Sequence, residues 1–336
     1  MKLLTVTVPC YNSQDYMEKC VDSLLLGGDR MEIIIIDDGS KDNTGVIADS
    51  YAQRYPQIVR VIHQENGGHG EGINQGLMHA TGTYFKVVDS DDCLSADLPA
   101  FLDMLEECER QGGADMVLTN YYYVHSDGVG DRSINYSDVM ESGKILTWDQ
   151  IKPFKIHQMM SIHSSTFRTE AMRDGWRPLP KHTFYEDNLM VQQGLVNAKR
   201  LCYMNADLYR YTIGREGQSV QDDIIRKRYD HQIRSSQACF TTCHLDDIPE
   251  PQKKKYFKHA LFMLLAFAII FARLNNTEKA DQDLQKMWDD CYAYDRKWAN
   301  HFRNRTALWF LCIGGPFGRW MVKTIHGIAR KVVRFN

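Results

Sequence analysis

The amino-acid sequence predicts an α/β fold: a mainly parallel sheet with helices on both faces, followed by a mostly helical C-terminal region. Two observations favour this fold. Strand-like and helix-like segments alternate up to about residue 125, the order that builds parallel sheets. Residues 33–36 are four consecutive isoleucines, as expected for a strand buried on both faces.

Each expected element of the first part has its own local signal. The strands are short runs rich in β-branched or aromatic residues, and the helices have apolar residues at helical spacing. Pro9, Gly27 and Pro56 end three of these runs. The expected strands cover residues 4–10, 31–37, 59–64, 83–89 and 114–124, and the expected helices cover residues 15–26, 44–55, 72–81 and 98–111.

The alternation stops near residue 125. Residues 124–138 are rich in Gly, Ser and Asp and predict a loop or an irregular hairpin. A helix over 186–196, a strand over 203–211 and further helices from about residue 222 are expected beyond it. We therefore predict a first domain over 1–220, with one half at about 1–125 and the other at about 126–220, and a helical region over 221–336.

Composition excludes several classes of protein. The 336 residues carry a net charge of −3, so the chain has no positive field of the kind that binds nucleic acid. Nine cysteines without a C-x-x-C pair favour a reducing cytosol over a disulfide framework. The N-terminus lacks the pattern of a signal peptide. The longest apolar run, 260–272, is shorter than the roughly 20 residues of a membrane span and predicts a buried helix.

The C-terminal tail has a different charge pattern. No acidic residue follows Asp295, and basic residues alternate there with Trp309, Phe310, Phe317 and Trp320. Basic amphipathic segments with aromatic residues are typical of helices that lie on a membrane surface. A terminal helix packed on the second region, with a solvated basic face, explains the pattern equally well.

Four polar stretches follow the first four expected strands: VPCYNS, DDGSKDNT, ENGGHGEGIN and DSDD. Ligands of doubly wound sheets bind outside the carboxyl ends of the strands, so four such stretches predict one shared pocket. Tyr11 offers a ring on which a base could stack, or is simply an aromatic residue of a turn. Asp37 and Asp38 could accept N–H or hydroxyl donors, or cap a helix.

The acidic stretch 89–92 places three carboxylates within four residues, where they repel one another. A divalent cation would offset this repulsion, and Mg²⁺ or Mn²⁺ prefers one or two protein carboxylates together with substrate phosphates. The glycine-rich stretch is neither a G-x-G-x-x-G nor a P-loop motif, which disfavours NAD-dependent hydride transfer and P-loop phosphoryl transfer.

These stretches, with ATGTYFKVVDSDD and the later FYEDNLM, resemble the family 2 glycosyltransferases in order and spacing. The resemblance is strong over about 1–125 and fair to about 220. It implies the GT-A fold and a metal-dependent, inverting transfer from a nucleotide-diphosphate sugar, usually a UDP-sugar, to a hydroxyl acceptor. The implied partners are this donor and a glycan or lipid-linked acceptor of a surface glycan, and the implied location is the cytoplasm or the cytoplasmic face of the membrane.

The resemblance also implies residue roles. Asp91 would ligate Mn²⁺ or Mg²⁺, and Asp92 would support its loop. Asp187 would take the proton of the acceptor hydroxyl, with Glu186 as the rival base; taken alone, this acidic pair would simply start a helix. The expected donor-binding residues are Pro9, Tyr11, Asp38, Asn66, His69, Asn74, Asp89 and Ser90.

The sequence departs from the family pattern at one point. Many relatives have Ala-Arg-Asn where this chain has Gly72-Ile73-Asn74, and Ile73 cannot replace the arginine that helps to hold the nucleotide. His69 or Asn74 would substitute for it. Arg215, Gln218 and Ser219 could form a loop near the diphosphate or a plain surface loop, and His163 could line the acceptor pocket or be structural.

Two other functions remain open on the sequence. An inactive sugar-nucleotide-binding protein would not need Asp89, Asp91 and Asp187, which are all present. A metal-dependent nucleotidyltransferase would need a basic glycine-rich loop after the first strand, which VPCYNSQDY does not provide.

Overall fold

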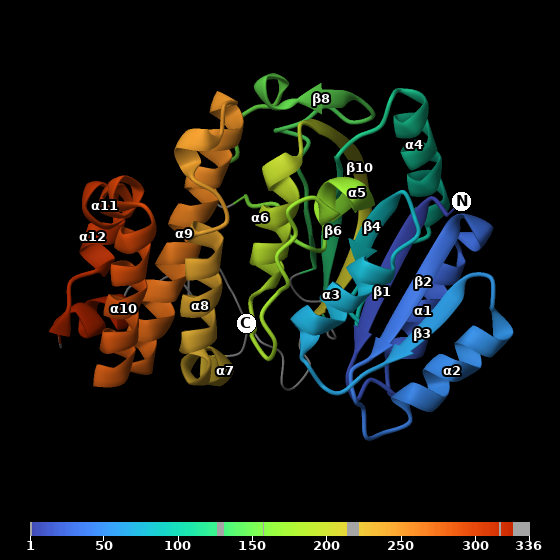
Figure 1. The fold of residues 1–336 in the computed structure, drawn as a ribbon, viewed down its shortest axis with the longest axis horizontal. Coiled ribbons are helices and arrows are strands. Elements are labelled where there is room, and N and C mark those ends of the chain that lie inside the picture. Colours follow the sequence, from blue (N-terminus) through green and yellow to red (C-terminus); the bar gives the residue numbers. More distant parts are fainter. Residues whose placement is uncertain (1, 126–130, 157, 214–221, 316, 325–336) are drawn as a thin grey trace. The chain divides into compact units, whose positions relative to one another are not determined.

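The computed structural model describes residues 2–125, 131–156, 158–213, 222–315 and 317–324. The chain divides into two compact units, Met1–Ile213 and Gly214–Asn336. The first unit contains the β-sheet, and the described part of the second unit is built from helices (Figure 1).

The first unit begins with the alternation that the sequence predicts. Most of the expected elements lie within a few residues of their predicted bounds, because their apolar patterns are local and regular. The strands are β1 (Leu4–Cys10), β2 (Met31–Asp37), β3 (Val59–His63), β4 (Tyr84–Val87) and β6 (Met116–His125), and the helices are α1 (Met17–Leu25), α2 (Thr44–Arg54), α3 (His69–His79) and α4 (Leu98–Arg110).

Helices cover both faces of the sheet, as predicted. Side chains of a strand alternate between its two faces. On β1, Leu4, Val6 and Val8 belong to the apolar core that also holds buried residues of α1, α2 and α4. The intervening Thr7 faces α3, where a Cβ on Gly76 would lie 2.2 Å from the threonine Oγ1. The glycine therefore lets α3 approach the strand closely.

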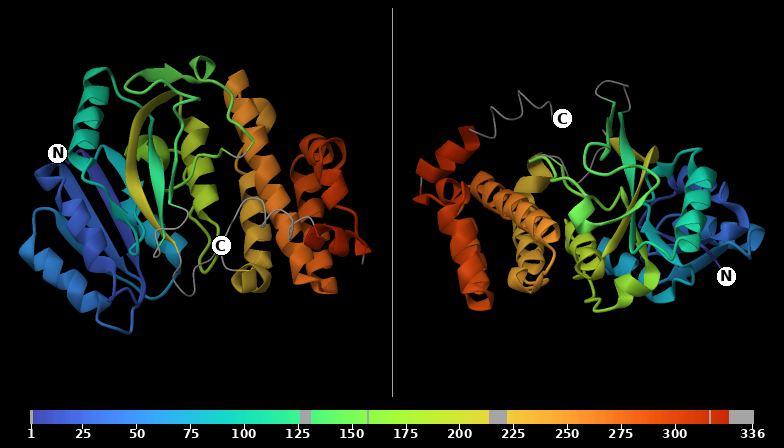
Figure 2. Two further views of the ribbon diagram at one scale, coloured as in Figure 1. Left: turned by 180° about the vertical axis from the view of Figure 1, so that it is seen from behind. Right: turned by 90° about the horizontal axis from the view of Figure 1, so that it is seen from above.

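The sheet is mixed rather than uniformly parallel. Its order is β3-β2-β1-β4-β9-β6-β10-β5 (Figures 1 and 2). The pairs of β1 with β2 and β4, of β2 with β3, and of β6 with β10 (Arg200–Ile213) are parallel. The short strand β9 (Ser165–Arg168) lies antiparallel between β4 and β6. The predicted parallel arrangement is thus confirmed for β1 to β4 and for β6 with β10, whereas β9 and the short strands β5 (Cys93–Leu94), β7 (Arg132–Ile134) and β8 (Ile145–Thr147) pair antiparallel.

The remaining elements of the first unit follow β6 in the chain or, like β5, pair with β10. The hairpin that the sequence allowed after residue 124 is present, since β7 (Arg132–Ile134) pairs antiparallel with β6. A long ladder of β6 with β10 positions the residues around Tyr209 beside the end of β4. The remaining elements are β5 (Cys93–Leu94), β8 (Ile145–Thr147), α5 (Thr169–Arg173) and α6 (Asp187–Asn197).

The second unit has a core of its own. Helices α8, α9 and α10 contact one another, and their buried side chains include Leu264, Ile269, Leu284 and Trp288. Asn276, in the left-handed conformation, ends α9, and the Thr277 hydroxyl caps α10. The described helices are α7 (Asp222–Lys227), α8 (Tyr229–Phe240), α9 (Pro251–Asn275), α10 (Glu278–Tyr294), α11 (Arg296–Arg305) and α12 (Leu308–Leu311).

Helix α9 corrects the length argument made from the apolar run 260–272. The helix continues in both directions and has 25 residues, so it is long and apolar enough to cross a membrane by length and composition. Core helices of soluble proteins pass the same test, and 61% of its most apolar window is buried inside the protein. The predicted burial is therefore present for part of the helix, whereas the apolar run of 13 residues underestimated the length of the helix.

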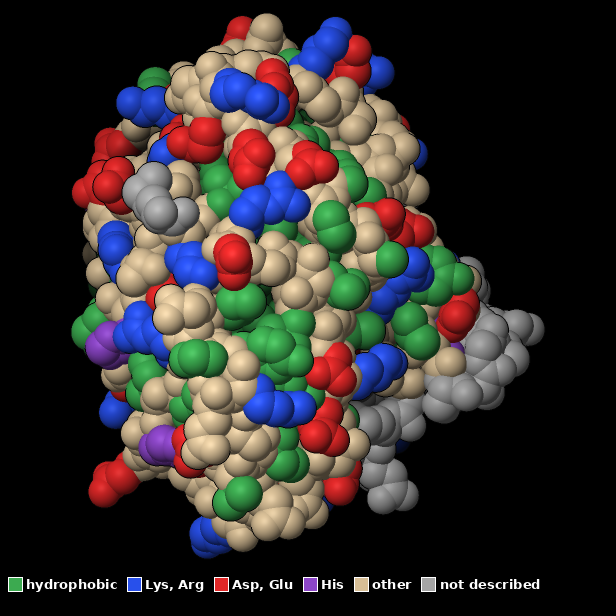
Figure 3. Space-filling view, turned by 90° about the vertical axis from the view of Figure 1, so that its right-hand side faces the viewer, with side chains coloured by type: hydrophobic (Ala, Val, Ile, Leu, Met, Phe, Trp, Pro, Cys, Tyr) green, Lys and Arg blue, Asp and Glu red, His purple; other side chains and the backbone are tan. Residues whose placement is uncertain are grey.

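The surface of the first unit shows no dominant charge on the face seen in Figure 3. Blue Lys and Arg side chains and red Asp and Glu side chains are interspersed on this face, and neither sign forms a continuous patch (Figure 3). This distribution agrees with the small net charge of −3.

Candidate active site

The carboxyl ends of the first strands bring the predicted stretches together. Cys10 of β1 pairs with Asp37 of β2, which pairs with His63 of β3, so the three loops that follow begin side by side. On the other side, Thr7 of β1 pairs with Val87 of β4, after which the acidic stretch begins. Parallel pairing thus gathers all four polar stretches at one edge of the sheet.

Asp38 holds the glycine-rich loop in place. Its carboxylate is buried and accepts bonds from Gln64 Nε2 at 2.6 Å and from the backbone N–H groups of Gly67 and Gly68 at 2.8 Å each. The Asn66 amide donates to the Asp38 carbonyl at 2.9 Å. The geometry gives Asp38 a structural task in the loop, and its predicted contact with a nucleobase stays a prediction.

The loops after β1 and β4 are linked by two serines. The hydroxyl groups of Ser13 and Ser90 lie 2.9 Å apart in a buried hydrogen bond. Ser13 Oγ also accepts the Tyr11 N–H at 3.2 Å. The Tyr11 ring itself is 48% exposed. Its face is therefore accessible for the stacking role that the sequence suggests.

His69 joins the acidic stretch after β4 to the acidic pair at the start of α6. Its Nε2 lies 2.8 Å from Asp89 Oδ1, and its Nδ1 lies 2.8 Å from Glu186 Oε1. The histidine begins α3, Asp89 follows β4, and Glu186 caps α6. Three segments that are far apart in the sequence therefore meet at one imidazole.

The charges of this bridge reinforce one another. Burial opposes the charged form of His69, but Asp89 and Glu186 raise its pKa well above the usual value. Burial likewise opposes ionisation of Asp89, but His69 and His163 lower its pKa. The arrangement is therefore an imidazolium between two carboxylates, in which both ring nitrogens donate.

Both carboxylate oxygens of Asp92 accept hydrogen bonds from β10. Tyr209 donates its hydroxyl to one oxygen and Thr212 its N–H to the other, both at 2.7 Å. Burial and the nearby Asp89 and Asp91 raise the Asp92 pKa. This agrees with the expectation that Asp92 supports the loop. Asp91, the predicted metal ligand, is half-buried.

Three side chains of the described residues could hold a metal ion: Asp89, Asp92 and His163. One ligand atom of each lies within 4.8 Å of the others. Two carboxylates and an imidazole suit Mn²⁺, and each carboxylate oxygen that already accepts one bond retains a lone pair. The residues fit a divalent cation, although the group does not include Asp91, whose role as a ligand stays a prediction.

Glu186 and Asp187 differ in their surroundings. Glu186 is 3% exposed and bound to His69. Asp187 starts α6, is half-buried, and accepts the Asn188 side-chain N–H at 3.0 Å. Burial and the neighbouring Glu186 raise the pKa of Asp187. Just before the pair, Tyr185 has φ +68°, a conformation that costs a non-glycine residue energy and recurs at functional sites.

His163, which the sequence suggested as a lining or structural residue, lies beside Asp89, and Lys86 is a neighbouring residue that sequence reasoning missed. His163 stacks on Tyr211 with ring centroids 4.5 Å apart, and its Nε2 lies 3.8 Å from Asp89 Oδ2. Lys86 is fully buried below it and donates to the His163 carbonyl at 2.7 Å. Burial lowers the Lys86 pKa to about 7. A lysine inside the apolar strand YFKVV was the available signal.

Three further residues that the sequence singled out, Pro9, Ile73 and Asn74, make contacts within the protein. Pro9 on β1 contacts α3, where a Cβ on Gly72 would lie 3.0 Å from the proline Cβ. Ile73 is fully buried in the core. Asn74 binds the backbone of Leu179, donating to its carbonyl at 3.0 Å and accepting its N–H at 2.8 Å. The donor-binding roles of Pro9 and Asn74 stay predictions.

Two side-chain groups that the sequence raised lie elsewhere. Arg215, Gln218 and Ser219 fall outside the described residues. Cys239 is buried in α8, and the metal-capable group within the described ranges contains neither Cys239 nor Cys243. This agrees with the expectation of helix packing.

Comparison with known proteins identifies the family of the first unit. A family model described as "Glycosyl transferase family 2" matches residues 5–170. The uncharacterized glycosyltransferase YibD of Escherichia coli (strain K12) is 46% identical over 213 residues, which are 62% of this chain and 60% of YibD. In alignments with four curated glycosyltransferases, the matched segment covers 30% to 60% of the relative's own length.

Solved structures share the fold over most of the chain. S. aureus TarS 1–349 in complex with UDP-GlcNAc superposes with a TM-score of 0.54 at 21% identity, covering 91% of this chain and 93% of that one. The mannosyltransferase PcManGT from Pyrobaculum calidifontis, in complex with GDP-Man and Mn²⁺, gives 0.52 at 17% identity, covering 89% and 83%. Residues 5–170 of this chain therefore form a family 2 glycosyltransferase domain, and the sheet-containing unit has the GT-A fold.

Proposed function

We propose that this glycosyltransferase moves a sugar from a UDP-sugar to a hydroxyl group of a surface glycan, with inversion at the anomeric carbon. The observation that carries the proposal is the bridge of Asp89, His69 and Glu186. It unites the acidic stretch expected at the donor with the Glu-Asp pair expected at the acceptor. A transfer reaction needs both substrates in one place.

Asp187 is the proposed base. Its raised pKa moves it towards neutrality, where a general base works best. The rival, Glu186, is buried and engaged by His69, so it is less available to an acceptor. The acceptor hydroxyl gives its proton to Asp187 as its oxygen bonds to the anomeric carbon. The bond from that carbon to the phosphate oxygen breaks, and the nucleoside diphosphate leaves with the electron pair.

A divalent cation, Mn²⁺ or Mg²⁺, is the proposed cofactor. Asp89, Asp92 and His163 would hold it, with Asp91 as the ligand that the family resemblance suggests. When bound, it would neutralise charge on the departing diphosphate. The Mn²⁺ in the PcManGT structure supports this choice, because that protein shares the fold.

The nucleotide and the acceptor are the finer parts of the proposal. The exposed ring of Tyr11 can stack on a base, and a structural neighbour contains UDP-GlcNAc. Another neighbour contains GDP-Man, so a uridine donor is a choice that needs a direct test. We place the acceptor, a glycan with or without a lipid carrier, in the cytoplasm or on the cytoplasmic face of the membrane.

The test combines a donor screen with an Asp187→Asn variant. The protein is incubated with UDP- and GDP-sugars, with Mn²⁺ or with a chelator, and release of the nucleoside diphosphate is measured. We expect metal-dependent release from a UDP-sugar. Asp187→Asn should bind the donor normally but lower turnover at least a hundredfold, in line with loss of a general base.

The exposed Glu170→Gln on α5 serves as the matched control and should keep full activity. Release from GDP-sugars alone would overturn the choice of UDP. Full turnover by Asp187→Asn would exclude this residue as the base, and a second variant, Glu186→Gln, then tests the rival. Retained configuration in the product, read by NMR, would contradict the single displacement.

A further inference from the structure

Four large aromatic side chains are exposed near the C-terminal end of the second unit. Trp309 and Phe310 on α12 are 55% and 41% exposed, and Phe317 and Trp320 are 60% and 63% exposed. They include both exposed tryptophans of the described residues. Exposing such rings to water is unfavourable, and clusters of them mark interaction sites.

The helical segment 317–324 separates its aromatic residues from its buried side. Met321 and Val322 are buried, as is Gly318. Residues three apart lie on one side of a helix, so Phe317 and Trp320 share a side that lies opposite Gly318 and Val322, with Met321 beside it. The core of this unit therefore does not explain the two rings.

An ion pair fixes this segment to its own unit. Arg319 donates to Asp281 Oδ2 at 2.6 Å, and the other oxygen of Asp281 binds the buried Arg273 of α9. Because Arg319 is engaged in this way, it anchors the helix. Arg319 thus has a carboxylate partner within the protein, which it shares with Arg273, unlike the charges described next.

The same part of the chain is strongly basic. Residues 296–336 contain nine Lys and Arg and no Asp or Glu. Because the whole chain has a charge of −3, the first 295 residues carry −12. Among the described residues, Arg296, Arg305 and Lys323 are exposed and have no carboxylate within ion-pair distance. Their charge is available to an anionic partner.

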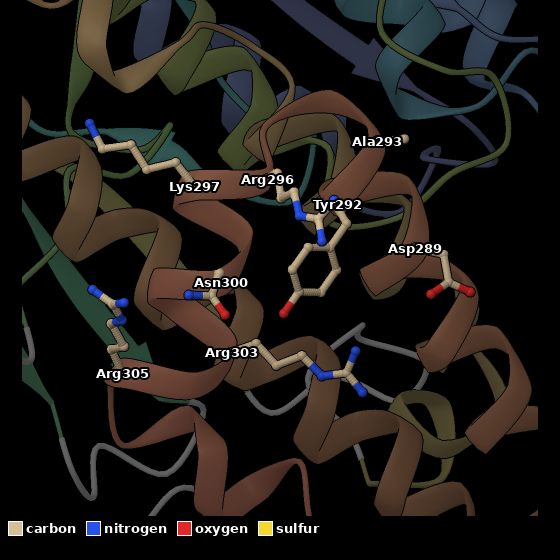
Figure 4. Close-up of a pocket in the computed structure, with 8 residues that line it drawn as sticks. All are labelled: Asp289, Tyr292, Ala293, Arg296, Lys297, Asn300, Arg303 and Arg305. Carbon is tan, nitrogen blue, oxygen red and sulfur yellow. The ribbon is translucent and has the colours of Figure 1, made fainter.

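A groove of about 1120 Å³ between α10 and α11 concentrates part of this charge. Figure 4 shows Tyr292, Arg296 and Asn300 near its centre, whereas Asp289, its single carboxylate, lies at the opposite edge from Lys297 and Arg305. Arg305 also helps to lower the pKa of the nearby His301, after burial and Lys258. The groove is thus open and predominantly cationic, with the following lining residues: Asp289, Tyr292, Ala293, Arg296, Lys297, Asn300, Arg303 and Arg305.

We propose that the C-terminal part of the second unit, over 296–315 and 317–324, docks on an anionic phospholipid bilayer. The rings of Trp309, Phe310, Phe317 and Trp320 would enter the interface between headgroups and acyl chains, while Arg296, Arg305 and Lys323 meet the lipid phosphates. Aromatic rings and basic side chains are the two components by which peripheral helices bind such surfaces. Neither component belongs to the candidate active site, so docking and sugar transfer can fail separately.

Flotation of the full chain with vesicles tests this proposal. We expect binding to phosphatidylcholine vesicles that contain about one third phosphatidylglycerol, and loss of binding when salt shortens the Debye length from about 10 Å to about 3 Å. Phe317→Ala with Trp320→Ala should weaken binding at least tenfold. Arg296→Gln with Arg305→Gln should do the same, since each cation near such a surface contributes about fivefold.

Matched controls come from the first unit. Met78→Ala removes a side chain that is 60% exposed, and Arg110→Gln removes an exposed charge; neither should change binding. Every variant should keep the turnover of donor in solution. Equal binding to pure phosphatidylcholine, or unchanged binding of both double variants, would overturn the proposal. The proposal would also be overturned if the wild type sediments as a dimer and the Phe317→Ala, Trp320→Ala double variant as a monomer. That result would assign the exposed rings to contact with a second copy of the chain.

Discussion

At the scale of single residues, the candidate site gathers several carboxylates around few positively charged side chains. Asp89, Asp92, Glu186 and Asp187 converge, and His69 lies between two of them. The sequence placed Asp89 and Asp92 at a strand end, and the family resemblance implied that Glu186 and Asp187 join them. The sequence could not predict that one imidazole would bridge Asp89 and Glu186, since side-chain partners depend on the packing of α3 against distant segments.

Replacing His69 should affect both stability and turnover. His69→Gln removes the charge between Asp89 and Glu186, so we expect a loss of about 1 kcal/mol in the free energy of unfolding, a modest value because the side chain is 36% exposed and water screens it. Turnover should fall about tenfold or more as the two acids move apart. Urea denaturation and steady-state kinetics measure the two effects.

His79→Gln, at the exposed end of the same helix, is the control and should match the wild type in both measurements. If His69→Gln also matches the wild type, the bridge has no role in positioning the acids.

At the scale of elements, the sequence predicted the strands and helices with local patterns but not the strand pairing between distant segments. The strands and helices of residues 4–110 follow from runs of apolar residues that each contain their own signal. The insertion of β9 between β4 and β6 does not, because four residues with no distinctive pattern pair with strands about 50 and 80 residues away. The extension of α9 beyond its apolar run was missed because its first turns contain lysines.

A buried carboxylate that joins several elements should make stability depend on acid pH. Glu32 of β2 accepts bonds from the Thr5 hydroxyl at 2.6 Å, the Thr81 N–H at 2.7 Å and Arg60 at 2.9 Å. Burial opposes its charge, but these donors lower its pKa below 4.5. Its stabilisation is therefore complete above about 4.5 and is lost as the pH falls through the lowered folded-state pKa.

We expect Glu32→Gln to lower the free energy of unfolding by about 2 kcal/mol at neutral pH and by less under acid conditions. Denaturant titrations at several pH values measure this, with the exposed Glu65→Gln as the control. A difference between Glu32→Gln and wild type that stays constant down to the acid-unfolding limit would contradict the assignment.

At the scale of the whole molecule, two units with separate cores share one chain. The core of the first unit is formed by β1, β2, α1, α2 and α4. That of the second includes Leu264, Ile269 and Trp288 of α9 and α10. The sequence indicated this organisation through the change from alternating strands and helices to continuous helices. Which side chains each unit exposes to solvent depends on tertiary packing. The exposure of the aromatic rings of α12 could therefore be established only from the structure.

Residues 1–213 expressed alone should therefore fold. This fragment contains the complete sheet and its helices, which bury a continuous apolar core. We expect a cooperative thermal transition by circular dichroism and a mixed helix and strand spectrum. The full chain, measured in parallel, is the reference. A fragment that melts without a cooperative transition would show that the first unit depends on the second for its stability.

The imidazole of His69 has a consequence for how the two substrates influence each other. A ligand that draws Asp89 away leaves the histidine with Glu186 alone, beside Asp187. Occupancy at the donor end must then change the electrostatic potential felt at the acceptor end. By thermodynamic reciprocity, an acceptor that perturbs Glu186 changes the affinity for donor by the same factor, so the two substrates bind with coupled rather than independent affinities.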